Sequence, residues 1–306
     1  MNARKIVVGF DGSKSSRVAL TWAMRAAKVR AVPLLLAHAG FAGVASVGAS
    51  ATSADDSHDA LTQAERAMVT AAIHEAHREV PGVEVESTIV TGLPADALLR
   101  LLDGAEMLVV GSRGRGGFAE ALLGSTSLQV ATHATCPVVV IRSVDHVEPG
   151  PDAGRVLVGV DGSDSSTQAL EFAFEEASLR ACGLTAIYAW DVPSFQAYGW
   201  LSVPQPDSVL PAYEREASRL LAEALAGWTE KFPDVDVRRV TAHAAPVAAL
   251  VADSAGAEVV VVGSRGLGGF RSLLLGSVGH GVLHHAHCPV AVVHRGANGT
   301  GQQVQS

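Results

Sequence analysis

Two stretches of this chain carry nearly the same sequence. Gly111–Ser125 reads GSRGRGGFAEALLGS and Gly263–Ser277 reads GSRGLGGFRSLLLGS, so only four of fifteen positions differ. Upstream, Ile6–Ser13 aligns with Val156–Ser163 at an offset of 150 residues, and the later stretches align at 152. Self-similarity on this scale predicts two copies of one domain, which agrees with a length of 306 residues.

The domain boundaries follow from this repeat and from composition. We expect a first domain over 1–143 and a second over 155–296. The intervening 144–154 is rich in Pro, Gly and Asp and lacks periodicity, so it is interpreted as a linker. Residues 297–306 are expected to form a disordered tail.

Each copy alternates short apolar runs with segments of helical periodicity. Ile6–Phe10 is such a run, and Val18, Trp22, Ala26 and Val29 recur at helical spacing behind it. The alternation predicts an α/β fold with a parallel sheet covered by helices on both faces. Gly40–Ser57 and Asp191–Ser208 break the pattern and are predicted to be loops, the second containing Phe195, Tyr198 and Trp200.

Charge and apolar content exclude several classes of protein. The formal net charge is −8, with 23 basic and 31 acidic residues and no basic block, so nucleic acid is not an expected partner. No apolar segment is long enough to span a bilayer and no leader is recognisable, so we expect no membrane span and a cytoplasmic protein. Cys136, Cys182 and Cys288 form no C-x-x-C pair and are interpreted as small buried residues.

The repeated glycine-rich stretch, here called the arch, predicts an anion site. Each arch follows a β-branched run and leads into a predicted helix, where backbone N–H groups and a helix N-terminus can hold phosphate. Arg113 and Arg265 carry charge of the right sign, although a solvated side chain is the alternative. The arches lack the lysine of G-x-x-x-x-G-K-[ST], and Ala119 and Arg271 replace the last glycine of G-x-G-x-x-G. The site is therefore neither a P-loop nor a dinucleotide fingerprint.

An aspartate ends the first predicted strand of each copy. Asp11 and Asp161 can accept bonds from ribose hydroxyls or hold a metal beside phosphates, while the alternative is a helix cap or turn residue. Ser13 and Ser163 are equally suited to the capping role, so we favour a ligand role for the aspartates.

The sequence supports no catalytic or metal site. His284, His285, His287 and Cys288 resemble a ligand cluster, but the repeat places Thr132, His133, Thr135 and Cys136 at the matching positions. Histidines in a last helical turn also suit the helix dipole. No Ser/His/Asp or Cys/His arrangement can be assembled from repeated positions, so we assign neither catalytic nor metal-binding residues.

The chain resembles the universal stress proteins, specifically their tandem two-domain, ATP-binding type. The resemblance rests on the first-strand segment ending in Asp-Gly-Ser, on the arch with nine residues between Gly114 and Gly124, and on the Cys-Pro-Val-Val-Val that follows. The resemblance implies a five-stranded parallel sheet in the order 3-2-1-4-5 in each copy, a Rossmann-like arrangement. It also implies two ATP sites, with Asp11 at the ribose, Ala39 at the adenine and the arch at the phosphates. The implied nucleotide-binding residues are Gly9, Asp11, Ala39, Gly111, Ser112, Arg113, Gly114, Gly124, Ser125 and Thr126 in the first copy, and Gly159, Asp161, Ala189, Gly263, Ser264, Arg265, Gly266, Gly276, Ser277 and Val278 in the second.

Three functions stay open at this point. We favour an ATP-binding, nucleotide-dependent regulator of the stress response, with or without Mg²⁺, that pairs into a homodimer and acts on an unidentified protein partner. The alternatives are a slow ATPase or adenylyl-transferring enzyme on the same fold, and an interaction protein whose glycines only shape loops. H-I-G-H and S-G-G-x-D-S, which mark adenylating relatives, do not occur.

Overall fold

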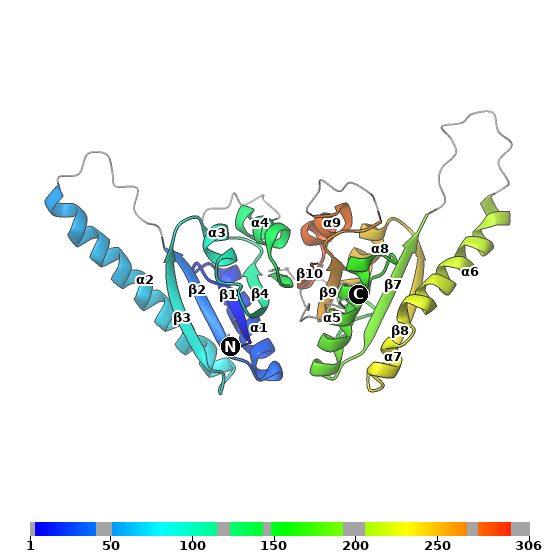
Figure 1. Cartoon of the computed structure of the whole chain (residues 1–306), viewed down its shortest axis with the longest axis horizontal. Coiled ribbons are helices and arrows are strands. Elements are labelled where there is room, and N and C mark those ends of the chain that lie inside the picture. The colour runs from blue at the N-terminus through cyan, green and yellow to red at the C-terminus, as the bar shows by residue number, and fades with distance from the viewer. Residues whose placement is uncertain are drawn as a thin grey trace, which may run out of the picture. The chain divides into compact units, whose positions relative to one another are not determined.

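A computed structural model of the chain describes residues 4–40, 51–114, 123–142, 148–191, 206–267 and 275–294, with the backbone alone described for 51–62 and 206–209. The chain divides into two units, one within Met1–Ser143 and the other within Val144–Arg295. In each unit strands alternate with helices (Figure 1). The predicted tail, 297–306, lies outside the described residues.

The first unit contains β1 (Lys5–Gly9), α1 (Lys14–Arg30), β2 (Leu34–Gly40), α2 (Ala51–Glu79), β3 (Val85–Thr91), α3 (Pro94–Leu99), β4 (Ala105–Gly111), α4 (Ser125–His133) and β5 (Val138–Ile141). The second contains β6 (Val156–Gly159), α5 (Asp164–Arg180), β7 (Leu184–Trp190), α6 (Pro206–Leu225), α7 (Trp228–Lys231), β8 (Val237–His243), α8 (Pro246–Asp253), β9 (Val259–Gly263), α9 (Ser277–His285) and β10 (Val290–Val293).

The strands of each unit are parallel and follow the predicted order. In the first unit the order is β3-β2-β1-β4-β5, and in the second it is β8-β7-β6-β9-β10. In the first unit α1 and α2 contact each other, as do α3 and α4. The right-handed crossovers of parallel strands place α1 and α2 on one face and α3 and α4 on the other. The prediction of an α/β fold with helices on both faces of a five-stranded parallel sheet is confirmed.

The core lies along the central strands, because these are covered on both faces. Every residue of the runs Ile6–Val8, Met107–Val109 and Val259–Val261 is completely buried. Strands buried on both sides need continuous apolar sequence, and β-branched valine suits the pleated surface. The edge strands β3 and β8, which mix apolar with polar residues, are only partly buried. The carboxyl ends of β4 and β9 lead into the arches.

The predicted loops were partly wrong. α2 begins at Ala51, so residues 51–57 are helical and not part of a loop, and α6 begins at Pro206. Residues 51–57 contain no large apolar side chain, so the helical periodicity that the sequence shows from about Leu61 did not indicate the earlier start. Residues 41–50 and 192–205, including Phe195, Tyr198 and Trp200, lie outside the described residues.

The segment predicted as a linker packs on the second unit over the half that is described. The backbone N–H groups of Gly150 and Gly154 donate to the carbonyls of Ala255 and Gly256 at 2.8 and 2.9 Å. Asp152 is fully buried, and its Oδ1 accepts from Thr185 at 2.6 Å and from Arg238 at 3.1 Å. Turn residues in the sequence indicated a break in periodicity, but a buried aspartate with these partners makes 148–154 part of the second unit.

No helix in the described ranges is long and apolar enough to cross a lipid bilayer.

Candidate functional site

The site of each unit starts at the turn after its first strand. In the first unit Asp11 Oδ1 accepts the backbone N–H of Ser13 at 3.0 Å, and Gly12 sits between them at φ +80°. The Ser13 hydroxyl accepts the N–H of Ser16 at 3.1 Å and so caps α1. In the second unit Ser163 caps α5 in the same way. Because serine supplies the cap, neither aspartate is needed for it.

The two ends of each arch are tied together by backbone bonds. In the first unit Ser112 N–H donates to Ile141 O at 2.8 Å and Gly124 N–H donates to Ser112 O at 2.7 Å. The Ser127 hydroxyl donates to Gly111 O at 2.6 Å. In the second unit Ser264 and Gly276 repeat the backbone bonds at 2.8 and 2.7 Å. The start of the helix therefore lies directly beside the end of the strand, as the repeat predicted. Residues 115–122 and 268–274 of the arches lie outside the described residues.

Each arch closes onto the aspartate of the same unit. A Cβ added at Gly114 would lie 2.8 Å from Asp11 Oδ2, and one at Gly266 would lie 2.6 Å from Asp161 Oδ2. In the second unit the backbone N–H of Leu267 also donates to Asp161 Oδ2 at 3.1 Å. These glycines are needed because a side chain would push the carboxylate away. The fold thus brings together the two features that the sequence singled out separately.

Further hydroxyls join the first turn of α1 or α5 to its arch. The Ser13 hydroxyl donates to Arg113 O at 3.3 Å, and the Ser165 hydroxyl donates to Arg265 O. The carboxylate of Asp161 accepts both the N–H and the hydroxyl of Ser163, at 2.9 and 2.6 Å. The aspartate, the helix start and the arch therefore form one hydrogen-bonded corner at the carboxyl edge of the sheet, the place where open α/β sheets bind ligands.

Among the described residues, the helices that follow the arches start without a side-chain cap. α4 and α9 begin behind Gly124 and Gly276, and neither cap makes a side-chain hydrogen bond. By contrast, α1 and α5 are capped by serine. The first N–H groups of an uncapped helix are free donors with a favourable dipole, so both can hold an anion. Ser125 and Ser277 are exposed at this end, while Thr126 and Val278 are half-buried.

The remaining predicted residues have other surroundings. Gly9 and Gly159 pack against Leu98 and Leu250, whose Cδ1 atoms would lie 2.9 and 3.1 Å from an added Cβ. Gly111 and Gly263 lie against Ser15 and Ser165 in the first turns of α1 and α5. Arg113 and Arg265 are exposed and Ser112 and Ser264 are buried. Ala39 and Ala189 are half-buried near the ends of β2 and β7. Four of the glycines are thus explained by packing within the unit.

The surroundings of the two sites differ at the ends of β2 and β7, which sequence reasoning missed. In the first unit buried His38 contacts Phe10 O through Nδ1 at 2.7 Å and lies 3.6 Å from Glu65 of α2 through Nε2. In the second unit Trp190 occupies the place of Gly40 and stacks on His243 and Tyr213, with ring centroids 4.5 and 6.2 Å apart. The exchange of Gly40 for Trp190 at equivalent repeat positions is the sequence signal that would have predicted this difference.

Another contact that the sequence did not indicate involves α2. A Cβ on Gly12 would lie 2.5 Å from the sulfur of Met68, so α2 packs directly on the turn that carries Asp11. Since these residues are far apart in the chain, no local pattern could have shown it.

The histidines of α9 and the three cysteines are buried to different degrees in the described structure. The rings of His280 and His284 are neighbours on α9, 4.5 Å apart, and His285 is exposed. Across the described parts of the chain no group of three or more His, Cys, Asp or Glu side chains could hold a metal ion. Burial of Cys136 and Cys288 is confirmed, while Cys182 is half-buried. Burial raises the pKa of the Cys136 thiol to about 12.

The fold defines an α/β domain with a five-stranded parallel sheet, present twice. The family model of the universal stress protein family matches residues 2–142 and 153–294. The chain belongs to this family, as a tandem two-domain member.

Curated relatives share the tandem organisation along their length. The chain is 40% identical to the universal stress protein Rv2005c of Mycobacterium tuberculosis over 291 residues, covering 94% of this chain and 96% of the relative. It is 39% identical to Rv2623 of the same organism, covering 94% and 95%. Among solved structures, a universal stress protein from Archaeoglobus fulgidus is similar with a TM-score of 0.63 at 21% identity, covering 96% of this chain and 97% of that one. The structural likeness concerns the fold alone.

Proposed function

We propose that each unit binds one ATP and that occupancy of the two sites regulates the protein in the stress response. The observation that carries this proposal is the corner found in both units, in which an aspartate carboxylate meets an arch glycine beside an uncapped helix start. A carboxylate accepts the hydroxyls of a ribose, and free helical N–H groups donate to phosphate. A nucleotide is a ligand that needs both.

The residues fit such a ligand in chemical type. In the proposal Asp11 and Asp161 accept the ribose hydroxyls. The N–H groups and hydroxyls at the starts of α4 and α9 hold the phosphates, and Arg113 and Arg265 add positive charge from the rim. The adenine lies near Ala39 and Ala189. Val278 lacks the hydroxyl of Thr126, so we expect weaker phosphate binding in the second unit.

The proposal includes an oligomer and a partner. We infer a homodimer in the cytoplasm, where ATP is available, and a protein partner whose binding depends on nucleotide occupancy. A binding role is preferred to catalysis because aspartate, serine and backbone groups make the hydrogen bonds of the corner, and no histidine, lysine or cysteine side chain takes part in them among the described residues.

Isothermal titration calorimetry and native mass spectrometry test this function. The wild-type chain should bind two ATP, whereas Asp11→Asn and Asp161→Asn should each bind one, since the amide is a weaker acceptor and presents an N–H₂ group to the ribose. Asp234→Asn removes an exposed carboxylate in a turn and serves as the control that should still bind two. If both aspartate variants bind ATP like the control, the assignment of the site is wrong. The same spectra give the oligomeric state.

A further inference from the structure

A methionine of α2 lies against the turn that carries Asp11. A Cβ on Gly12 would lie 2.5 Å from the sulfur of Met68, 3.6 Å from its Cγ and 3.7 Å from its Cε. The three atoms nearest to that Cβ thus all belong to the thioether of one side chain. Because a single added carbon at Gly12 would already overlap the sulfur, the contact has no room for a further atom.

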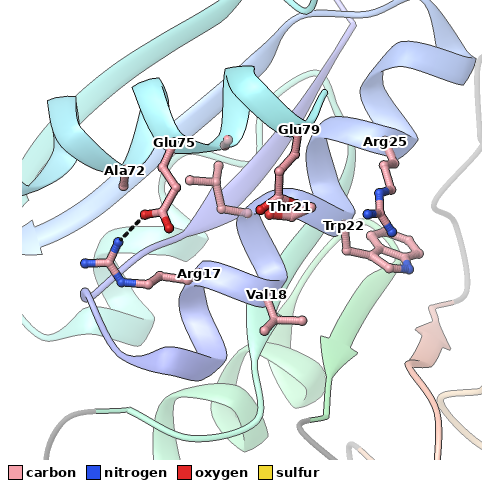
Figure 2. Close-up of a pocket in the computed structure, with 10 residues that line it drawn as sticks. Arg17, Val18, Thr21, Trp22, Arg25, Ala72, Glu75 and Glu79 are labelled. Carbon is pink, nitrogen blue, oxygen red and sulfur yellow. Dashed lines mark hydrogen bonds and ion pairs between the residues drawn. The ribbon is translucent and has the colours of Figure 1, made fainter. Parts of the chain in front are cut away.

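Contacts on both sides of Met68 hold α2 beside this turn. Figure 2 shows Arg17 of α1 bridging to Glu75 of α2, and the Nη1–Oε2 distance is 2.9 Å. Val69, the next residue of α2, is 3% exposed and anchors the helix in the core. Residues 11–13, by contrast, belong to neither a strand nor a helix. A group added to Met68 therefore displaces the turn more readily than it displaces the helix.

The turn that Met68 contacts sets the position of the carboxylate of the corner. The backbone N–H of Ser13 donates to Asp11 Oδ1 at 3.0 Å, across Gly12. The Ser13 hydroxyl donates to Arg113 O at 3.3 Å, so the same serine also joins the turn to the arch. A displacement of Gly12 disturbs both bonds, because it lies between the donor and acceptor of the first and next to the donor of the second. A change in the size or polarity of the Met68 side chain therefore reaches the proposed ligand site.

Among the described methionines, Met68 is the best placed to react with an oxidant. The chain has 4 methionines. Met24 and Met107 are completely buried, and Met1 lies outside the described residues, whereas Met68 is half-buried. A partly exposed thioether reacts before a buried one, and its oxidation converts an apolar side chain into a polar one.

The second unit has no equivalent of this contact among its described residues. The repeat aligns α2 with α6 at an offset of 152 residues, at which β3 and β8 begin together. Leu220 then corresponds to Met68, and leucine has no sulfur to oxidise. A Cβ on Gly162 would meet no described atom within 4 Å. The chain thus contains one turn that an oxidised side chain can displace and one that lacks this contact.

We propose that Met68 is a site of reversible oxidation by peroxide that lowers the ATP affinity of the first unit and leaves the second unit unchanged. The inference rests on the proposed ATP binding. A sulfur lone pair attacks one oxygen of hydrogen peroxide, the O–O bond breaks and an S–O bond forms. The sulfur is oxidised by two electrons to the sulfoxide, and the other oxygen leaves as water with both hydrogens. The added oxygen displaces the Gly12 turn, and with it Asp11, from the position that accepts the ribose.

Calorimetry of ATP binding before and after treatment with hydrogen peroxide tests this inference. Peptide mapping by mass spectrometry selects the dose at which Met68 carries one added oxygen while Met24 and Met107 carry none. We expect two tight sites in the reduced chain and one in the oxidised chain, with binding at the first site weaker by about tenfold or more. Treatment with methionine sulfoxide reductase should restore two tight sites.

Variants with a single remaining site show which unit responds. In Asp161→Asn, which keeps the first site, oxidation of Met68 should abolish the remaining tight binding. In Asp11→Asn, which keeps the second site, the same treatment should change nothing.

Substitutions at Met68 and at its repeat counterpart provide the matched comparison. Met68→Leu keeps the volume of the side chain but not the sulfur, so it should bind two ATP with and without peroxide. It also controls for Cys182, a half-buried thiol that peroxide can reach. Met68→Gln imitates the polar sulfoxide and should bind one ATP tightly without any oxidant. Leu220→Gln makes a similar change in the second unit and should still bind two.

The outcomes separate this inference from the proposed function. Two tight sites of unchanged affinity in the chain oxidised at Met68 overturn the inference alone. Loss of the first site in peroxide-treated Met68→Leu also overturns it, because another residue is then responsible. A reduced wild-type chain that binds no ATP refutes the proposed function, and the inference fails with it.

Discussion

The contact between Gly266 and Asp161 allows a sharp test of the proposed ATP sites. Gly266→Ala places a Cβ 2.6 Å from Asp161 Oδ2. Ordinary van der Waals contact begins at 3.4 Å, so the carboxylate oxygen has to move by about 0.8 Å. At Gly114 the distance to Asp11 Oδ2 is 2.8 Å, and the required movement is about 0.6 Å. Both substitutions leave the sheet and helices untouched, because residues 114 and 266 are exposed.

The size of the effect follows from the bonds of the carboxylate. Asp161 Oδ2 accepts the N–H of Leu267 at 3.1 Å, and a shift of this size away from the arch takes that bond beyond hydrogen-bond range. A hydrogen bond to a charged group contributes about 1.5–3 kcal/mol. If the ribose bonds to the same carboxylate are lost to a similar degree, the affinity of this site falls by about 10- to 100-fold. The other site in the same chain keeps its affinity.

Isothermal titration calorimetry measures this outcome directly. Gly266→Ala and Gly114→Ala should each reduce the tight-binding stoichiometry from two ATP to one, and the double variant should bind none tightly. The unchanged unit serves as an internal control, and an unchanged Tm shows that the variant is folded. Two tight sites of unaltered affinity in Gly266→Ala would refute the assignment of the carboxylate to the ligand.

Two further predictions concern the stability of the fold. Gly263→Ala puts a Cβ 2.9 Å from the backbone carbon and oxygen of Ser165, which cannot rotate away, so we expect the free energy of unfolding to fall by about 1–3 kcal/mol and calorimetry to give a lower Tm. Gly276→Ala is the control, because its Cβ would have its nearest atom at 3.5 Å and should change Tm little. Equal Tm values for the two variants would contradict this explanation. Burial raises the pKa of the Cys136 thiol from 9.0 to about 12. Above pH 9 the unfolded chain therefore releases a proton that the folded chain retains. At pH 10 this lowers the free energy of unfolding by about 1.4 kcal/mol. Urea unfolding at pH 8 and pH 10 should show this loss in the wild type but not in Cys136→Ala, and the same pH dependence in both would be inconsistent with it.

The sequence by itself determined the duplication, the strands and the serine-capped starts of α1 and α5. Apolar runs such as Val259–Val262 became buried strands, and Ser13 and Ser163 became the caps of α1 and α5. These features depend on residues close together in the chain, so periodicity and cap chemistry are sufficient to predict them. The order of the strands came from the resemblance to the universal stress proteins. The start of α2 was placed too late, and 148–154 was taken for linker although Asp152 is buried.

Only the tertiary structure decided which of the predicted residues meet. Asp11 and Gly114 are separated by most of a domain, and their contact exists because parallel strands end at the same edge of the sheet. The structure also gave Gly9 and Gly111 packing roles against Leu98 and Ser15. These outcomes depend on the volume and position of side chains from distant segments, which no local pattern encodes.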